Sequence, residues 1–345
     1  MTQMTGRERF EAVMAGRAVD RPLYDFWIED ATLNRLFAHI GHRDVERLLD
    51  ELGVDIRSAD AIYPPEEHLG DGVYRNYWGE RYVYRTLEWG HQRDDLPGVL
   101  ANAESFEEIK CFPWPKNKAF DYSTLRTQCE RIRDKGCVVR YGQADIWQRG
   151  SLVRGMENTM TDMYEEPEWT HYISRIFTDF YKEDYRRAWE ESGGAIDIFT
   201  IISDVGSQRG PLISPAMFRE FVLPYMAELI EVIHSFGARA MFHSCGDVSA
   251  FIPDIIRAGA DILDPIQPVN ESMMPAALAQ YKGELIFHGG VDVQRLLPNG
   301  TPDEVRAYVR RYYETLGSSW IVCPSHYFQP DNLPENILAV YDAFK

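Results

Sequence analysis

A histidine and a cysteine two positions apart are the residues of this sequence best suited to chemistry. His243 and Cys245 lie in the segment Phe242-His243-Ser244-Cys245-Gly246, at the end of a short apolar run. If that run is a β-strand, side chains two positions apart point the same way. One imidazole nitrogen and one thiolate are half of a tetrahedral zinc site. The pair therefore predicts a metal half-site, although both residue types also pack in cores.

A second cysteine and histidine lie close together near the C-terminus. Cys323 ends an apolar run, and His326 follows three positions later. We expect Cys323 to supply a third metal ligand from the turn after the last strand, with His326 as its rival or as a group that handles a proton. Three protein ligands with one open position are typical of catalytic zinc.

Other polar residues also follow apolar runs. Asp204 and His288 do so, and we expect them to act in catalysis beside His326. The residues that we expect to contact a substrate are Trp27, Tyr141, Gln208 and Arg209. The turn that holds Asp204, Gln208 and Arg209 also contains glycines, so it either orients a ligand or simply caps the next helix.

These residues lie far apart in the sequence, so they can form one site only in a fold that brings the ends of many strands together. Eight apolar runs are predicted strands, at residues 21–27, 54–58, 137–141, 196–202, 238–243, 261–265, 284–288 and 319–323. Amphipathic segments between and after them predict helices, including residues 43–52, 165–191, 223–236, 301–316 and 334–344. This alternation predicts an α/β fold, a single (β/α)8 TIM barrel over residues 1–345, with its site at the C-terminal ends of the strands. An open doubly wound sheet is the alternative, but no GxGxxG follows a strand.

Residues 62–114 interrupt the alternation. They contain Gly70-Asp71-Gly72 and the aromatic series Tyr74, Tyr77, Trp78, Tyr82 and Tyr84. A glycine-rich turn beside closely spaced aromatic residues indicates β-strands. We expect a β-rich excursion that covers one end of the barrel and is not a second domain.

Composition and charge narrow the function classes. The 345 residues are 45% hydrophobic and 26% charged, which is typical of a globular enzyme, and the formal net charge of −18 makes nucleic acid an unsuitable partner. No run approaches the ~18 apolar residues of a membrane helix. The first 16 residues lack the apolar core of a signal peptide, so we expect a cytoplasmic protein that does not span a membrane. Five widely spaced cysteines do not suggest a disulfide framework.

Short segments along almost the whole chain resemble those of a known family and occur in the same order. They are residues 5–10 (TGRERF), 20–22 (DRP), 209–215 (RGPLISP), 242–246 (FHSCG), 263–268 (LDPIQP), 287–292 (FHGGVD), 324–326 (PSH) and 333–337 (LPENI). The chain resembles the uroporphyrinogen decarboxylase superfamily, and within it the cobalamin-dependent methyltransferase-like branch. True decarboxylases of the family hold the substrate propionates with arginines after the first strand. Residues 24–30 (YDFWIED) are acidic and contain no arginine, which argues against a porphyrinogen substrate.

The resemblance implies a reaction and its cofactors. His243 and Cys245 would bind zinc with a later cysteine, and the best match to that cysteine is His326. A methyl group would move between a small substrate (an O-methyl aromatic, a methylamine or a thiol) and cobalamin on a separate corrinoid protein, since the chain has no D-x-H-x-x-G motif of its own. The alternatives are a metal-independent decarboxylase of a non-porphyrin acid and a non-catalytic barrel. Barrels of this type often pair through their helices, so a homodimer is also expected.

Overall fold

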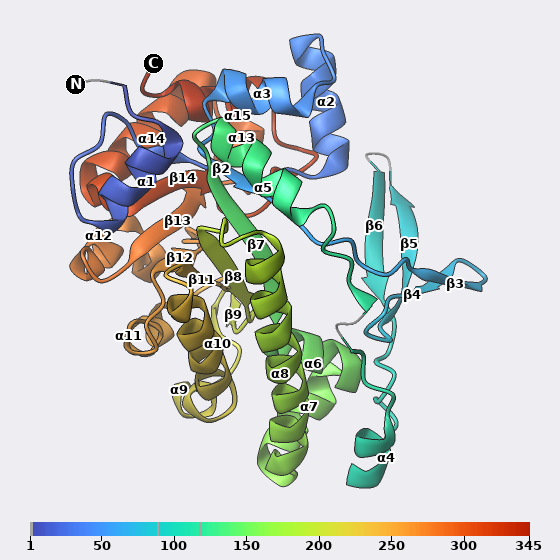
Figure 1. The fold of residues 1–345 in the computed structure, drawn as a ribbon. Coiled ribbons are helices and arrows are strands. Elements are labelled where there is room, and N and C mark those ends of the chain that lie inside the picture. The colour runs from blue at the N-terminus through green and yellow to red at the C-terminus, as the bar shows by residue number, and fades with distance from the viewer. Residues whose placement is uncertain (1–2, 88–89, 117–118) are drawn as a thin grey trace.

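The computed structural model describes residues 3–87, 90–116 and 119–345, and its centre is a barrel of eight parallel strands (Figure 1). In spatial order they are β1 (Leu23–Tyr24), β14 (Trp320–Pro324), β13 (Ile286–Val291), β12 (Ile262–Asp264), β11 (Arg239–His243), β8 (Ile198–Ile202), β7 (Val138–Asp145) and β2 (Ile56–Ser58). Between β1 and β2, the Asp55 amide donates to the Tyr24 carbonyl at 2.8 Å. The (β/α)8 fold and all eight predicted strands are confirmed.

Helices connect the strands and pack around the barrel. They include α2 (Asp30–Ile40), α3 (Val45–Leu52), α5 (Leu125–Asp134), α6 (Trp147–Arg154), α7 (Met156–Glu165), α8 (Pro167–Glu191), α10 (Leu223–Ser235), α11 (Ile252–Arg257), α12 (Pro275–Leu278), α14 (Pro302–Leu316) and α15 (Pro334–Asp342). In the described part of the chain, none of the helices has the length and apolar character needed to cross a bilayer.

The inward side chains of the strands form two layers of opposite character. The first layer is apolar and consists of Leu23, Ile56, Val138, Ile198, Met241, Ile262, Ile286 and Ile321. Helix α1 (Gly6–Met14) packs Phe10 and Val13 against this layer. Two positions further along each strand lies a second layer, made of Asp25, Ser58, Arg140, Thr200, His243, Asp264, His288 and Cys323. Side chains two positions apart share a face of a strand, so the apolar layer closes the N-terminal end of the barrel and the polar layer lies toward the C-terminal ends of the strands.

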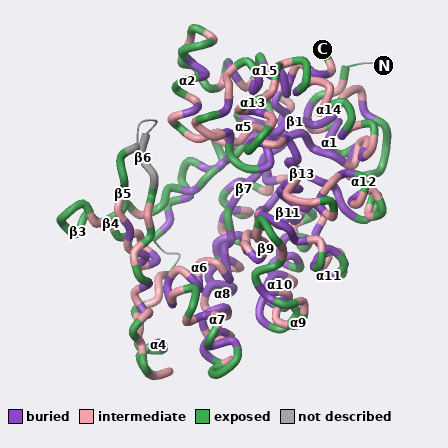
Figure 2. The backbone as a smooth tube through the Cα atoms, turned by 180° about the vertical axis from the view of Figure 1, so that it is seen from behind, coloured by how far each residue is buried: buried purple, intermediate pink, exposed green. Residues whose placement is uncertain are grey.

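The excursion is a four-stranded antiparallel sheet, followed by α4 (Phe106–Cys111). Its strands are β3 (Glu67–Gly70), β4 (Val73–Arg75), β5 (Arg81–Leu87) and β6 (Gly90–Asp95). Its β-rich character is confirmed. Figure 1 shows it beside the barrel in cyan, and Figure 2 shows that its outer strands are mostly exposed while the barrel centre is buried. The sheet therefore stands beside the barrel.

A buried ion pair and an aromatic contact fix this sheet to the barrel. Glu80 is 2% exposed, and both of its carboxylate oxygens accept from Arg149 Nη1 of α6, at 2.7 and 2.9 Å. Arg93 of β6 donates to the same carboxylate at 3.0 Å. The Trp78 ring packs on Phe180 of α8 with 4.5 Å between centroids. The position of the sheet thus depends on a compensated buried charge.

Replacing Glu80 with alanine should lower the free energy of unfolding by about 3–5 kcal/mol, because the largely buried Arg149 guanidinium loses its nearest carboxylate and keeps only Asp145, at 3.9 Å. The control is Glu67→Ala, which breaks an exposed pair with Arg75 and should change stability by at most ~1 kcal/mol. Denaturant unfolding measures both variants. Equal effects of the two substitutions would show that the Glu80 contact does not fix the sheet.

Candidate active site

The polar layer contains a continuous chain of hydrogen bonds across five strands. Arg140 Nη1 donates to Asp25, and His288 Nε2 lies 3.0 Å from Asp25 Oδ2. The Nδ1 atoms of His288 and His243 both contact Asp264, one on each carboxylate oxygen. Asp25, Asp264 and His288 are at most 1% exposed. With Asp264 accepting at Nδ1 of both rings, the Nε2 atom of His243 is left free to bind another group.

The positive and negative side chains of this hydrogen-bonded series offset one another in pairs. Burial opposes the charged form of His288, but the carboxylates of Asp264 and Asp25 outweigh burial and hold the pKa of His288 well above its usual value. Burial likewise opposes the charged form of Asp264, yet the two histidines hold the pKa of that carboxyl well below its usual range. Arg140 and the His288 imidazolium therefore offset Asp25 and Asp264, as buried charges require.

Three potential ligand atoms lie close together at the mouth of the barrel, where this series of hydrogen bonds ends. His243 Nε2 lies 3.6 Å from Cys245 Sγ and 3.7 Å from Asp204 Oδ1. The Cys245 amide donates to Asp204 Oδ1 at 2.8 Å, and the three ligand atoms all lie within 4.8 Å of one another. An imidazole nitrogen, a thiol and a carboxylate are a donor set that suits zinc, and Asp264 is the outer carboxylate that orients such a histidine. The residues present therefore fit a zinc ion.

Cys323 lies in a different part of the layer. It is fully buried with Asp25 and His288, whereas His243 groups with Asp204 and Cys245. Burial raises the pKa of the Cys323 thiol to about 12. Asp25 already contacts Arg140, and an arginine beside a carboxylate opposes a second cation. The structure thus separates Cys323 from the pair that the sequence predicts it to complete, because β12 and β13 lie between β14 and β11.

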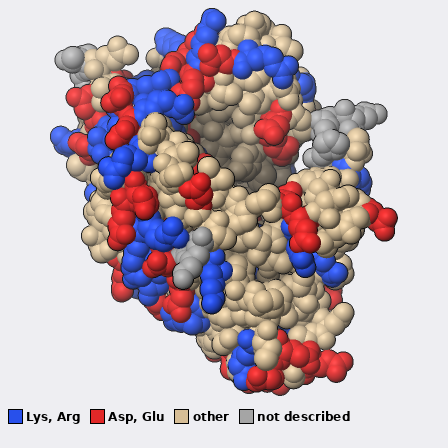
Figure 3. Space-filling view, turned by 45° about the vertical axis from the view of Figure 1, so that its right-hand side comes forward, with Lys and Arg blue, Asp and Glu red and all other residues tan. Residues whose placement is uncertain are grey.

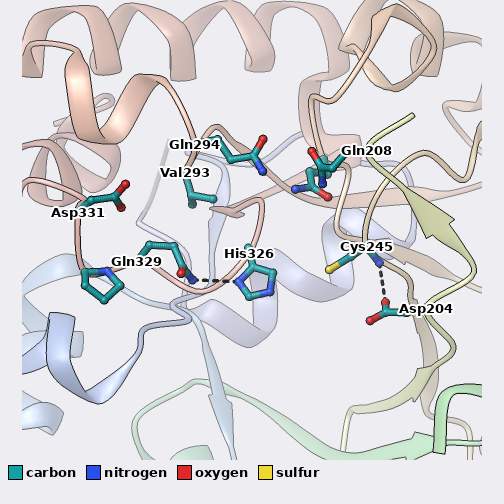
Figure 4. Close-up of a pocket in the computed structure, with 10 residues that line it drawn as sticks. Asp204, Gln208, Cys245, Val293, Gln294, His326, Gln329 and Asp331 are labelled. Carbon is teal, nitrogen blue, oxygen red and sulfur yellow. Dashed lines mark hydrogen bonds between the residues drawn. The ribbon is translucent and has the colours of Figure 1, made fainter. Parts of the chain in front are cut away.

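His326 lies on the same cavity as Cys245 and Asp204 (Figure 4). Its Nδ1 is 3.1 Å from Gln329 Nε2. Burial, followed by the charge of His243, lowers the pKa of His326, so the neutral imidazole is favoured. His326 is therefore placed to exchange a proton with a bound molecule at this cavity.

Two cavities meet at Asp204. The first has a volume of about 800 Å³ and is lined by Asp204, Gln208, Cys245, Gln267, Val293, Gln294, His326, Gln329, Pro330 and Asp331. The second, of about 580 Å³, is bordered by His243, Trp27, Thr200 and Tyr327 among others. Figure 3 shows that the surface is hollowed between the barrel and the four-stranded sheet. Both volumes are in the range of small-molecule sites.

The expected substrate contacts divide into two groups. Trp27 borders the second cavity and stacks on the His243 ring at 5.8 Å, and Gln208 borders the first cavity. Arg209 is exposed at the turn between β9 (Gly206–Ser207) and β10 (Gly210–Pro211) and lines neither of these cavities. Tyr141 borders the second cavity, but its hydroxyl donates to Asp184 of α8 at 3.0 Å, outside the barrel.

The predicted catalytic residues also differ in access. Asp204 and His326 border the first cavity, while His288 has no exposed surface and can act only through its neighbours. Sequence reasoning missed Asp25, Arg140 and Asp264. A repeated signal was present, because each follows an apolar inward residue of its strand by two positions.

Comparison with known proteins places this fold and site in a family. Residues 148–345, more than half of the chain, match the uroporphyrinogen decarboxylase (URO-D) family, and the chain belongs to that family. The methylated-thiol–coenzyme M methyltransferase of Methanosarcina mazei is 29% identical over 154 residues, which are 44% of this chain and 38% of that protein. The match thus spans well under half of the relative's length.

Solved structures extend the comparison. A methyltransferase from Methanosarcina mazei has a TM-score of 0.72 at 17% identity, over 99% of this chain and 98% of that one, which supports the barrel fold. A putative vitamin-B12 independent methionine synthase from Listeria monocytogenes gives a TM-score of 0.42 at 10% identity, over 94% and 98% of the two chains. The resemblance to the uroporphyrinogen decarboxylase superfamily, in its methyltransferase-like branch, is confirmed.

The two site cysteines should differ in reactivity with iodoacetamide at neutral pH. Cys245 borders an open cavity and should be labelled in the folded protein, whereas Cys323 should be labelled only after unfolding, because its thiol is buried and its high pKa keeps it protonated. Peptide mass spectrometry follows both sites, with exposed Cys111 as the positive control. Labelling of Cys323 at the rate of Cys245 would contradict this geometry.

Proposed function

We propose that this protein is a zinc-dependent methyltransferase that moves a methyl group between a small substrate and cobalamin carried by a separate corrinoid protein. The convergence of His243 Nε2, Cys245 Sγ and Asp204 Oδ1 at the junction of two cavities carries the proposal. Membership of the family and the methyltransferase among the matched relatives support the reaction class.

Zinc held by these residues would supply a Lewis acid for the substrate heteroatom. The chain's own residues do the positioning. Asp264 fixes the His243 ring through Nδ1, and Trp27 covers a face of the same ring. The buried Asp25 and His288 in turn hold Asp264 in one orientation. An imidazole that is already oriented loses little freedom when its Nε2 binds a ligand.

We assign the third ligand position to Asp204 in place of Cys323. Asp204 is held from two sides, since Gln148 Nε2 donates to Oδ2 at 3.1 Å and the Cys245 amide donates to Oδ1. His326, at the same cavity, is the group that would handle a proton on the substrate or leaving group.

Two cavities that meet at one centre suit a transfer between two reactants. Methyl transfer requires a donor and an acceptor to approach the same carbon from different directions. The smaller cavity would hold the substrate, and the larger would face the corrinoid protein.

Zinc content after reconstitution under reducing conditions tests the proposal. About one zinc per chain is expected in the parent and in Cys323→Ser. Cys245→Ser should bind zinc roughly 100-fold more weakly or worse, since loss of even an outer partner costs 10–100-fold. Transfer of a methyl group to cob(I)alamin, followed by its absorbance spectrum, should track zinc content.

Two other results of the zinc measurement would change the proposal. A reconstituted chain that holds no zinc would rule out this mechanism and favour the metal-independent decarboxylase, with Asp204 and His326 as its acid–base groups. Loss of zinc in Cys323→Ser as well as in Cys245→Ser would restore Cys323 as the third ligand.

A further inference from the structure

Glutamine side chains surround much of the first cavity. The sequence contains ten glutamines, and four of them line this cavity, namely Gln208, Gln267, Gln294 and Gln329. They follow strands β8, β12, β13 and β14, respectively, and β11, which lies between β8 and β12 in the barrel, is followed by Cys245. The four amides therefore form an arc along the rim of the barrel, on both sides of Cys245. Figure 4 shows Gln208, Gln294 and Gln329 around the same cavity as Cys245.

Three of these amides have hydrogen-bonding groups that the protein does not use. Gln267 is 4% exposed, and its Oε1 accepts from the Gly246 amide at 2.8 Å, whereas its Nε2 has no partner in the described part of the chain. The side chains of Gln208 and Gln294 are exposed at the cavity and form no hydrogen bond with any described residue. Because the Gly246 contact fixes which way the Gln267 amide is turned, its N–H donors are available to whatever fills the cavity.

The other polar groups of the cavity also suit an uncharged ligand that both donates and accepts. Among the described residues that line it, none is a lysine or an arginine, and the carboxylates are Asp204 and Asp331. The neutral imidazole of His326 is favoured, because burial lowers its pKa. An amide group donates to a carboxylate or to a glutamine oxygen and accepts from a glutamine nitrogen. A ligand with several amide groups therefore matches this lining.

A corrin macrocycle carries amides in the arrangement that this rim matches. Its cobalt lies at the centre of the ring, and acetamide and propionamide groups extend from the edge. The rim has the same plan, since His243, Cys245 and Asp204 lie together and the glutamines form an arc around them. A corrin that directs its cobalt toward these three residues brings its edge amides to the glutamines.

We propose that the first cavity receives the corrin macrocycle itself, and that Gln208, Gln267 and Gln294 hydrogen-bond to the amide groups at its edge. This inference rests on the proposed function for the identity of the ligand, but the binding needs neither zinc nor turnover. It makes the three glutamines specificity-determining residues for the corrinoid. It also distinguishes their role from contacts with the polypeptide of the corrinoid protein.

A matched pair of free corrins tests the amide contacts. Equilibrium dialysis of the chain before zinc reconstitution would compare dicyanocobinamide with dicyanocobester, in which methyl esters replace the edge amides. Cyanide on both faces of the ring keeps the cobalt from Cys245. Cobinamide should bind at least about tenfold more tightly, because the esters keep their acceptors but lose every N–H donor. Equal or tighter binding of the ester overturns the proposal, as does the absence of saturable cobinamide binding.

Substitutions of the exposed glutamines test their part. Gln208→Met and Gln294→Met keep the length of the side chain and remove the amide, so together they should weaken cobinamide binding by about tenfold and cobester binding by less. The control is Gln280→Met, at an exposed glutamine that borders neither cavity, and it should leave both affinities unchanged. Unchanged cobinamide affinity in the double variant overturns the contact.

Zinc content and methyl transfer to a corrinoid protein, measured on the same variants, separate this inference from the proposed function. Cobinamide binding that depends on the glutamines, in a chain that neither holds zinc nor transfers methyl groups, would sustain the inference and remove the proposed function. The reverse result is a double variant with lower methyl transfer and unchanged cobinamide affinity. The glutamines would then contact the partner's polypeptide, so the inference would fail while the proposed function stood.

Discussion

Asp264 contacts two histidines at once, and the polar centre of the barrel depends on this carboxylate. It holds the Nδ1 atoms of His243 and His288, so it sets which nitrogen of His243 faces the mouth. Because Asp264 is 1% exposed, its charge has to be offset by neighbours and not by water. The histidines supply that offset, and Asp25 with Arg140 continue the balance to the far side of the barrel.

The two interior layers explain how the barrel tolerates so many buried polar groups. The apolar layer closes the N-terminal end and supplies the packing that stabilises the fold. The polar layer adds little net stability, since buried ion pairs often do no better than apolar side chains of the same size. Its contribution is orientation: each group has few alternative partners, so the ring of His243 is fixed before any ligand binds. Beyond this layer, Cys245 follows His243 by two residues and Asp204 follows Thr200 by four, and both border the open cavity at the mouth of the barrel.

Much of this arrangement follows from the periodicity of the strands. The rest depends on which strands become neighbours when the barrel closes. The eight strands were predictable because short apolar runs are typical of buried strands. The His243–Cys245 pair was predictable because residues two positions apart lie on the same face of a strand. Cys323 groups with Asp25 and His288 rather than with His243 and Cys245, because periodicity predicts the layer of a residue but not its neighbours across the barrel. Asp25 and Asp264 lie inside predicted strands. Their roles could not be predicted, because each carboxylate acts through contacts with histidines on other strands. Arg209 shares a turn with Asp204, yet the β9–β10 hairpin directs it to the surface.

X-ray absorption at the zinc edge tests the central claim most directly, because it counts the sulfur atoms bound to the metal. The account predicts one sulfur ligand per zinc, from Cys245, with imidazole and oxygen completing the set. Two sulfur ligands would mean that Cys323 reaches the metal and that the separation of the two cysteines is not the functional geometry. A zinc ion without any sulfur ligand would remove His243 and Cys245 as the metal site.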